Sequence, residues 1–112
     1  MTELIVSFEV DGKHFWPDAP EKYKEFRQPH RHLFKFVCFL PVAIKKGSDR
    51  PIELWEFRQN IIEWVTRIHG NPAQFNELSC EGLSNLLLEE FHLSKCYVFE
   101  DFSLGAVSYV RQ

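Results

Sequence analysis

The chain has 112 residues, and its 13 Lys and Arg against 16 Asp and Glu give a formal net charge of -3. This length predicts one domain over residues 1–112. The negative net charge gives no general positive potential that would attract nucleic acid. No apolar run approaches the roughly 18 residues of a membrane span. Three cysteines, far apart and without a C-x-x-C pair, favour reduced thiols, so we expect a cytoplasmic protein without a nucleic-acid or membrane partner.

The first half of the chain predicts two strands joined by a long loop. Leu4 to Val10 is β-branched and aromatic with rough alternation, and Asp11-Gly12 ends it. Leu33 to Ile44 is the strongest strand signal in the sequence. Between them, Lys13 to Pro29 holds three of the six prolines and many charges, which is too irregular for a helix of any length. An ordered loop of this size in a compact domain is usually functional.

The second half predicts two helices and then a hairpin. Apolar residues recur at spacings of three and four from Pro51 to Ile68, which indicates an amphipathic helix. Asn71 to Leu78 is interpreted as a connection, and Ser79 can cap a second helix that ends near His92. Cys96 to Phe102 and Ala106 to Val110 are two more strands.

The order of these elements is strand, strand, helix, helix, strand, strand. It predicts an α+β fold in which a four-stranded antiparallel sheet carries two helices on one face. Eleven Phe and a hydrophobic content of 45% also leave apolar surface for another subunit. We therefore expect a homo-oligomer.

Three of the five histidines gather around the first predicted hairpin. His30 and His32 are two residues apart, so on a strand they point to the same face, and His14 begins the preceding loop. Three neutral imidazoles with an open fourth position describe a catalytic zinc site. The alternative is a polar strand entrance beside an unrelated loop histidine. Spacing alone leaves both interpretations open.

Several short segments, taken together and in order, are similar to one family. They are Phe8-Glu9-Val10 before His14, His30-Arg31-His32, Ile52-Glu53-Leu54, Leu78-Ser79-Cys80-Glu81, and Val98-Phe99-Glu100-Asp101 ahead of Gly105-Ala106 and Tyr109. The set resembles the 6-pyruvoyltetrahydropterin synthase and 6-carboxytetrahydropterin synthase family of the tunnelling fold. The resemblance covers most of the chain, although each segment is short.

The resemblance implies a site and an assembly. His14, His30 and His32 look like the family's zinc ligands, and Glu100 looks like the glutamate that grips a pterin-type ring through its N–H groups. Glu81 looks like the acidic residue that supports the site, although it is equally suited to the first turn of a helix. Family members close their sheets into a barrel, usually as a hexamer with sites between subunits. Their substrate is dihydroneopterin triphosphate, from which triphosphate is released as the side chain rearranges.

The chain also departs from the family at the proton-transfer groups. The stretch before the H-x-H, Glu25 to Pro29, holds no catalytic cysteine, and Ile68 stands where the family has an aspartate before its histidine. His69 remains as the expected proton carrier. Cys38 or Cys80 could reach the site, although a cysteine among apolar residues is more often a small buried hydrophobe.

Two functions follow from these departures. Either the chain is a zinc-dependent lyase acting on a pterin-type substrate, or it is an inactive homologue that binds, senses or sequesters a pterin-like or purine-like ligand. Four basic residues in or beside the loop either meet ligand phosphates or belong to a solvated charged surface. They are Lys22, Lys24, Arg27 and Arg31.

Overall fold

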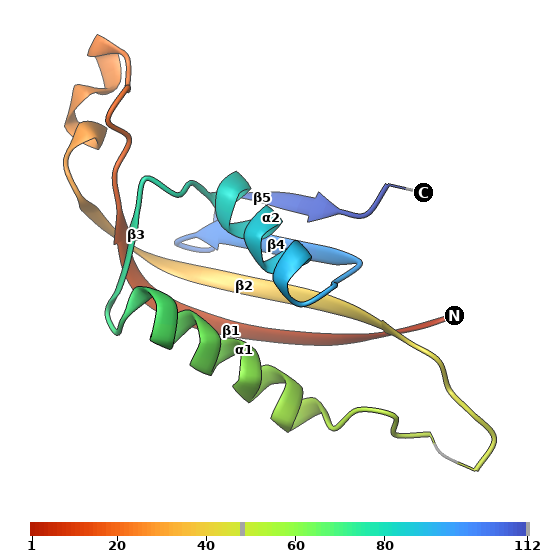
Figure 1. The fold of residues 1–112 in the computed structure, drawn as a ribbon. Coiled ribbons are helices and arrows are strands. Elements are labelled where there is room, and N and C mark those ends of the chain that lie inside the picture. The colour runs from red at the N-terminus through yellow and green to blue at the C-terminus, as the bar shows by residue number, and fades with distance from the viewer. Residues whose placement is uncertain (48, 112) are drawn as a thin grey trace.

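The computed structural model describes residues 1–47 and 49–111, which form an α+β fold built on a five-stranded mixed sheet (Figure 1). The elements are β1 (Thr2–His14), the 3-10 helix η1 (Glu21–Arg27), β2 (His30–Val42), α1 (Leu54–His69), β3 (Ala73–Asn76), α2 (Cys80–Glu90), β4 (Lys95–Glu100) and β5 (Leu104–Tyr109). The general α+β class predicted from the sequence is therefore confirmed.

The sheet has the strand order β3-β1-β2-β4-β5. β1 and β2 form a long antiparallel hairpin that runs from the Thr2–Val42 pair to the His14–His30 pair. β4 adds to β2 and β5 adds to β4, again antiparallel. Four strands thus follow the predicted antiparallel pattern.

The fifth strand, β3, was assigned from the sequence to a connection, and that assignment was wrong. β3 runs parallel to the end of β1, and it buries Ala73 and Phe75 while the residues between and after them are exposed. Four residues are too short to give a clear alternating pattern against the surrounding polar segment. The sheet is consequently mixed rather than antiparallel throughout.

Local capping explains where both long helices begin. The Glu53 carboxylate accepts the backbone N–H of Glu56 at 2.7 Å, so α1 begins at Leu54 rather than near Pro51. The Ser79 hydroxyl accepts the backbone N–H of Gly82 at 3.1 Å, and the predicted cap of α2 is confirmed.

One hydrophobic core lies between the sheet and the two long helices, which lie across the same sheet face (Figure 1). Phe34 and Phe36 of β2 are fully buried in it, as are Ile61 of α1 and Leu87 of α2. The opposite sheet face has no helix over it among the described residues. It carries exposed apolar side chains such as Tyr109, which is 63% exposed.

The loop between β1 and β2 is more regular than the sequence indicates. Residues Glu21–Arg27 form η1, with a kink at Tyr23. The Trp16 N–H donates to the Phe26 carbonyl at 2.7 Å, and Arg27 Nε donates to the Ala19 carbonyl at 2.9 Å. These bonds order a segment in which prolines and charges had argued against any helix. No helix among the described residues has both the length and the apolar character needed to cross a membrane.

A glycine on the inner sheet face supports the packing beneath the histidines. A Cβ added to Gly12 would lie 2.7 Å from Cε2 of Phe75 and 3.3 Å from Cβ of Ala73.

We predict that Gly12→Ala lowers the free energy of unfolding by about 1–3 kcal/mol, because the Phe75 ring must move within a closed core. Urea unfolding measures this. The matched change Ser7→Ala, on an exposed residue of the same strand, should change it by less than about 0.5 kcal/mol; an equal effect would contradict the packing role.

Candidate metal centre

Strand register brings the three predicted histidines together at one end of the sheet. His14 lies directly opposite His30 on the β1–β2 pair, and His32 follows two residues along β2 on the same face. Glu100 comes from β4, where its register partner is Phe34 of β2. The same alternation that buries the core side chains therefore continues into a polar cluster.

The cluster is compact enough for one ion. One ring nitrogen of each of His14, His30 and His32 lies within 4.8 Å of its counterparts in the other two. The ring centroids are 4.6 to 5.2 Å apart. His14 is buried, and the other two are half-buried. The sequence prediction that these residues lie together is confirmed, and the arrangement could hold a metal ion.

Each histidine is held by an oxygen acceptor on its Nδ1 side. The pairs are His14 with the Leu78 carbonyl (2.9 Å), His30 with the Gln28 carbonyl (2.9 Å) and His32 with Oδ2 of Asp101 (2.7 Å). A carbonyl or a carboxylate can only accept, so Nδ1 carries the hydrogen and a neutral ring presents a lone pair at Nε2. Hydrogen bonds of this kind orient histidine ligands in metal sites.

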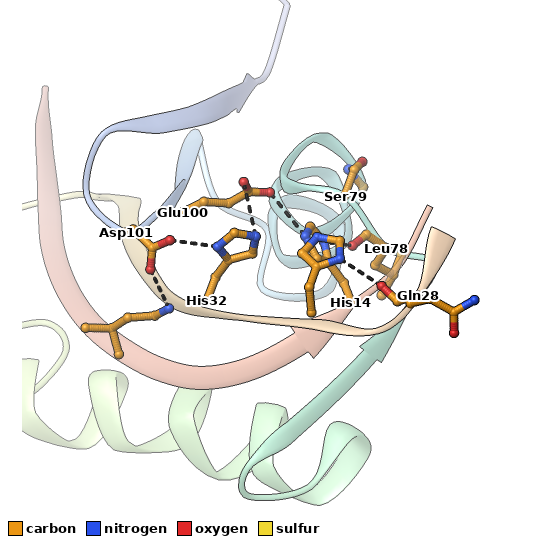
Figure 2. Close-up of polar contacts among 10 residues, drawn as sticks. His14, Gln28, His32, Leu78, Ser79, Glu100 and Asp101 are labelled. Atoms are coloured by element: carbon orange, nitrogen blue, oxygen red, sulfur yellow. Dashed lines mark hydrogen bonds and ion pairs between the residues drawn. The ribbon is translucent and has the colours of Figure 1, made fainter. Parts of the chain in front are cut away.

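Glu100 faces two of these lone pairs, as Figure 2 shows. Its Oε1 lies 3.3 Å from Nε2 of His14, and its Oε2 lies 3.6 Å from Nε2 of His32. Nitrogen lone pairs and a carboxylate repel one another unless a cation lies between them. Burial lowers the pKa of His14, so protonation of that ring is disfavoured as the source of the positive charge. The donor set thus fits a divalent metal ion.

Asp101 is a site residue that the sequence analysis missed. Its carboxylate accepts from His32 and also from the backbone N–H of Leu33 at 2.9 Å, and its own N–H donates to the Leu33 carbonyl at 2.8 Å. The hydrogen bonds from His32 and from Leu33 lower the pKa of Asp101, which keeps it ionised. Its backbone has a φ of 50°, a conformation that aspartate tolerates better than most residues. The sequence shows only an acid at a strand end.

A cavity of about 650 Å³ opens beside the histidines. Its lining combines the three histidines, three aromatic rings, three glutamates and two further residues. These residues are His14, Phe15, Trp16, Phe26, His30, His32, Glu77, Ser79, Glu81, Glu100 and Leu104. The volume lies in the range of small-molecule sites. Glu100 and Glu81, both predicted as ligand-binding residues, thus lie on the cavity wall, and Glu77 was not anticipated.

His69 lies apart from the metal cavity within one chain. It ends α1 and packs between Trp64 and Phe75, and it lines an adjoining cavity of about 560 Å³ that shares Phe15 and Glu77 with the first. Burial lowers the pKa of His69, partly offset by a hydrogen bond to the backbone of Gln74. Its Nε2 is buried without a partner among the described residues. The ring is therefore neutral and has a free lone pair.

The two cysteines considered as substitutes differ in position. Cys38 is buried in the core, with its Sγ 4.0 Å from that of Cys96. Cys80, at the start of α2, contacts Glu100; burial, reinforced by this carboxylate, raises the pKa of Cys80 to about 12. Cys80 thus reaches the site, but as a protonated thiol rather than a thiolate.

No protein-family model and no curated protein matches this chain. The resemblance noted in the sequence therefore remains a prediction, and the case for a function depends on the geometry of the site.

We predict that Asp101→Asn weakens metal binding by the three histidines, tested with added zinc, by about 10–100-fold, because the amide no longer provides the charge that orients His32 and makes it more basic. Competition with a chromophoric chelator measures this affinity. Asp11→Asn is the matched control, since Asp11 pairs with Arg31 at 2.6 Å and does not line the metal cavity. An unchanged affinity in Asp101→Asn would exclude the positioning role.

Proposed function

We propose that this chain is a zinc protein of the pterin-synthase type, in which His14, His30 and His32 hold the ion and the adjoining cavity takes a pterin-type ligand. One observation carries the proposal: three imidazoles, each oriented through Nδ1, lie together beside a ligand-sized cavity, and the Nε2 atoms of His14 and His32 face the carboxylate of Glu100. Three histidine ligands and one remaining position are typical of catalytic zinc. We also propose a cytoplasmic location, because the three cysteines are free, as is typical of a reducing compartment.

Glu100 and Glu81 would bind the ring of the ligand. A carboxylate accepts two parallel N–H bonds, and both residues line the cavity. Glu100 is 25% exposed and sits on a strand, so its position is fixed better than that of a loop residue. Glu100 contacts His14 and His32, so a ring bound by Glu100 would lie next to the proposed metal ligands.

In the enzymatic form of the proposal, the chain is a lyase. Zinc, when bound, polarises side-chain oxygens of the ligand and acidifies the adjacent C–H bonds. His69 is the candidate proton carrier, because its ring is neutral and its Nε2 has no partner among the described residues. The hydrogen bond to the Gln74 backbone would orient the His69 ring in place of the aspartate that the resemblance implies. For this role, His69 would need to reach a site formed between subunits.

A second candidate function, ligand binding without turnover, is favoured by the state of the thiols. Cys80 is the cysteine that contacts Glu100, and its raised pKa keeps it protonated at neutral pH. Cys38 lies in the core. A protein with this site would store, sense or sequester a pterin-like or purine-like molecule.

The uncovered sheet face supports a tunnelling-fold assembly. Val107 and Tyr109 of the edge strand β5 are 40% and 63% exposed, and Ile5 of β1 is 56% exposed on the same face. β1 pairs with β3 only from Gly12 to His14, so most of its outer edge is also open. Closing several copies into a barrel, with a hexamer as the expected form, would cover these edges.

Neopterin is a fluorescent probe of the proposed site. We expect it to bind the zinc-loaded protein, to bind more weakly after zinc is removed with a chelator, and to lose about tenfold or more in affinity in Glu100→Gln while zinc stays bound. Glu90→Gln, on the exposed end of α2, is the matched control. Equal binding by wild type and Glu100→Gln would contradict the anchor role.

Turnover separates the two candidate functions. Release of triphosphate from dihydroneopterin triphosphate by zinc-loaded protein, lost in His69→Ala with neopterin binding retained, would support the lyase. Neopterin binding without formation of any product over hours would exclude the lyase and support the binding protein.

A further inference from the structure

The metal cavity has an unusual charge for a site that resembles a triphosphate-binding family. Among its lining residues in the described chain there are three glutamates and no lysine or arginine. With the histidines neutral, the carboxylates contribute -3, and a divalent ion would leave the wall at -1. A triphosphate placed there would face carboxylates with the ion as the only cation.

The four basic residues considered for phosphate binding are engaged elsewhere. Arg31 points to the sheet face opposite the histidines and holds Asp11 through two bonds of 2.6 and 3.0 Å. Arg27 donates to the Ala19 carbonyl, and its guanidinium also lies 3.5 Å from Glu21.

The two lysines of η1 also contact other residues of the loop. Lys24 pairs with Glu21 at 3.6 Å, and Lys22 lies 5.0 Å from the centre of the Tyr23 ring. None of the four basic residues lines the cavity. Surface pairs of this kind are weak, so it is position rather than pairing that keeps these charges from the ligand.

Aromatic residues of the loop between β1 and β2 also line the cavity. They include Trp16 and Phe26, and these two residues are 48% and 41% exposed. Tyr23 stacks behind them, 6.4 Å from Trp16 and 5.9 Å from Phe26 between ring centroids. Because the loop is held by the Trp16–Phe26 backbone bond, these rings offer a fixed surface to a flat ligand.

Acceptors for N–H groups complete the lining. Glu77 and Glu81 have no hydrogen-bond or ion-pair partner for their carboxylates among residues 1–47 and 49–111. A flat heterocycle rich in N–H donors can satisfy such groups, whereas a phosphate cannot, because it brings only acceptors and negative charge.

We infer that the cavity selects a neutral or cationic nitrogen heterocycle that bears hydroxyl or carbonyl oxygens and no phosphate. This inference rests on the binding form of the proposed function, and it excludes the triphosphate substrate of the lyase form. The aromatic residues stack on the ring, the free glutamates accept its N–H groups, and the oxygens lie toward the histidines. The ligand would therefore come from a reaction that has already removed any phosphate.

Equilibrium binding of dihydroneopterin and of its triphosphate to the zinc-loaded wild-type protein tests the inference. We expect the unphosphorylated compound to bind at least about tenfold more tightly, because the triphosphate meets like charge. Glu77→Lys should raise triphosphate affinity by about tenfold or more relative to dihydroneopterin affinity, because it replaces a negative charge of the cavity lining with a positive one. Glu63→Lys, on the exposed face of α1, should change neither.

The outcomes distinguish this inference from the proposed function. Tighter binding of the triphosphate would overturn the inference alone and would indicate that another subunit supplies the phosphate-binding cations. Binding of neither compound, with zinc still bound, would overturn the proposed function and this inference with it.

Discussion

The site depends on one electrostatic constraint, the convergence of three imidazole lone pairs and a carboxylate on one small volume. Glu100 lies within 3.6 Å of Nε2 atoms of both His14 and His32, and the Nδ1 hydrogens are already donated to other acceptors. A cation between these acceptors would offset their mutual repulsion. The burial of His14 disfavours a proton there, so a metal ion is the simplest means of satisfying the cluster.

The cluster continues the alternation of inward-facing side chains along β1 and β2 beyond the end of the hydrophobic core. On β2 the same face carries His30, His32, Phe34 and Phe36 in succession, so the residues that anchor the sheet under the helices also fix the histidines. The long β1–β2 hairpin continues beyond α1 and α2 to the loop that supplies the aromatic residues of the cavity (Figure 1). Core packing and ligand geometry are therefore coupled through the strands.

Strand periodicity explains what could be predicted from the sequence. The alternation of side chains along a strand predicted that His30 and His32 lie on one face, and the predicted Ser79 cap located the start of α2. The same rule turns Arg31 to the other face, away from any phosphate at the site. The pattern could not reveal β3, because four residues give too weak a periodicity, nor Asp101, because its role depends on the long-range contact with His32. The position of His69 relative to the site depends on packing that no local pattern encodes.

Native mass spectrometry of the untagged protein, with zinc supplied during purification, tests the central claim most directly. The account predicts one zinc per chain in an oligomer, lost in the double variant His30→Ala/His32→Ala while that variant remains folded by circular dichroism. Wild-type protein that carries no zinc under these conditions would contradict it. The same would follow if the double variant retained zinc in full.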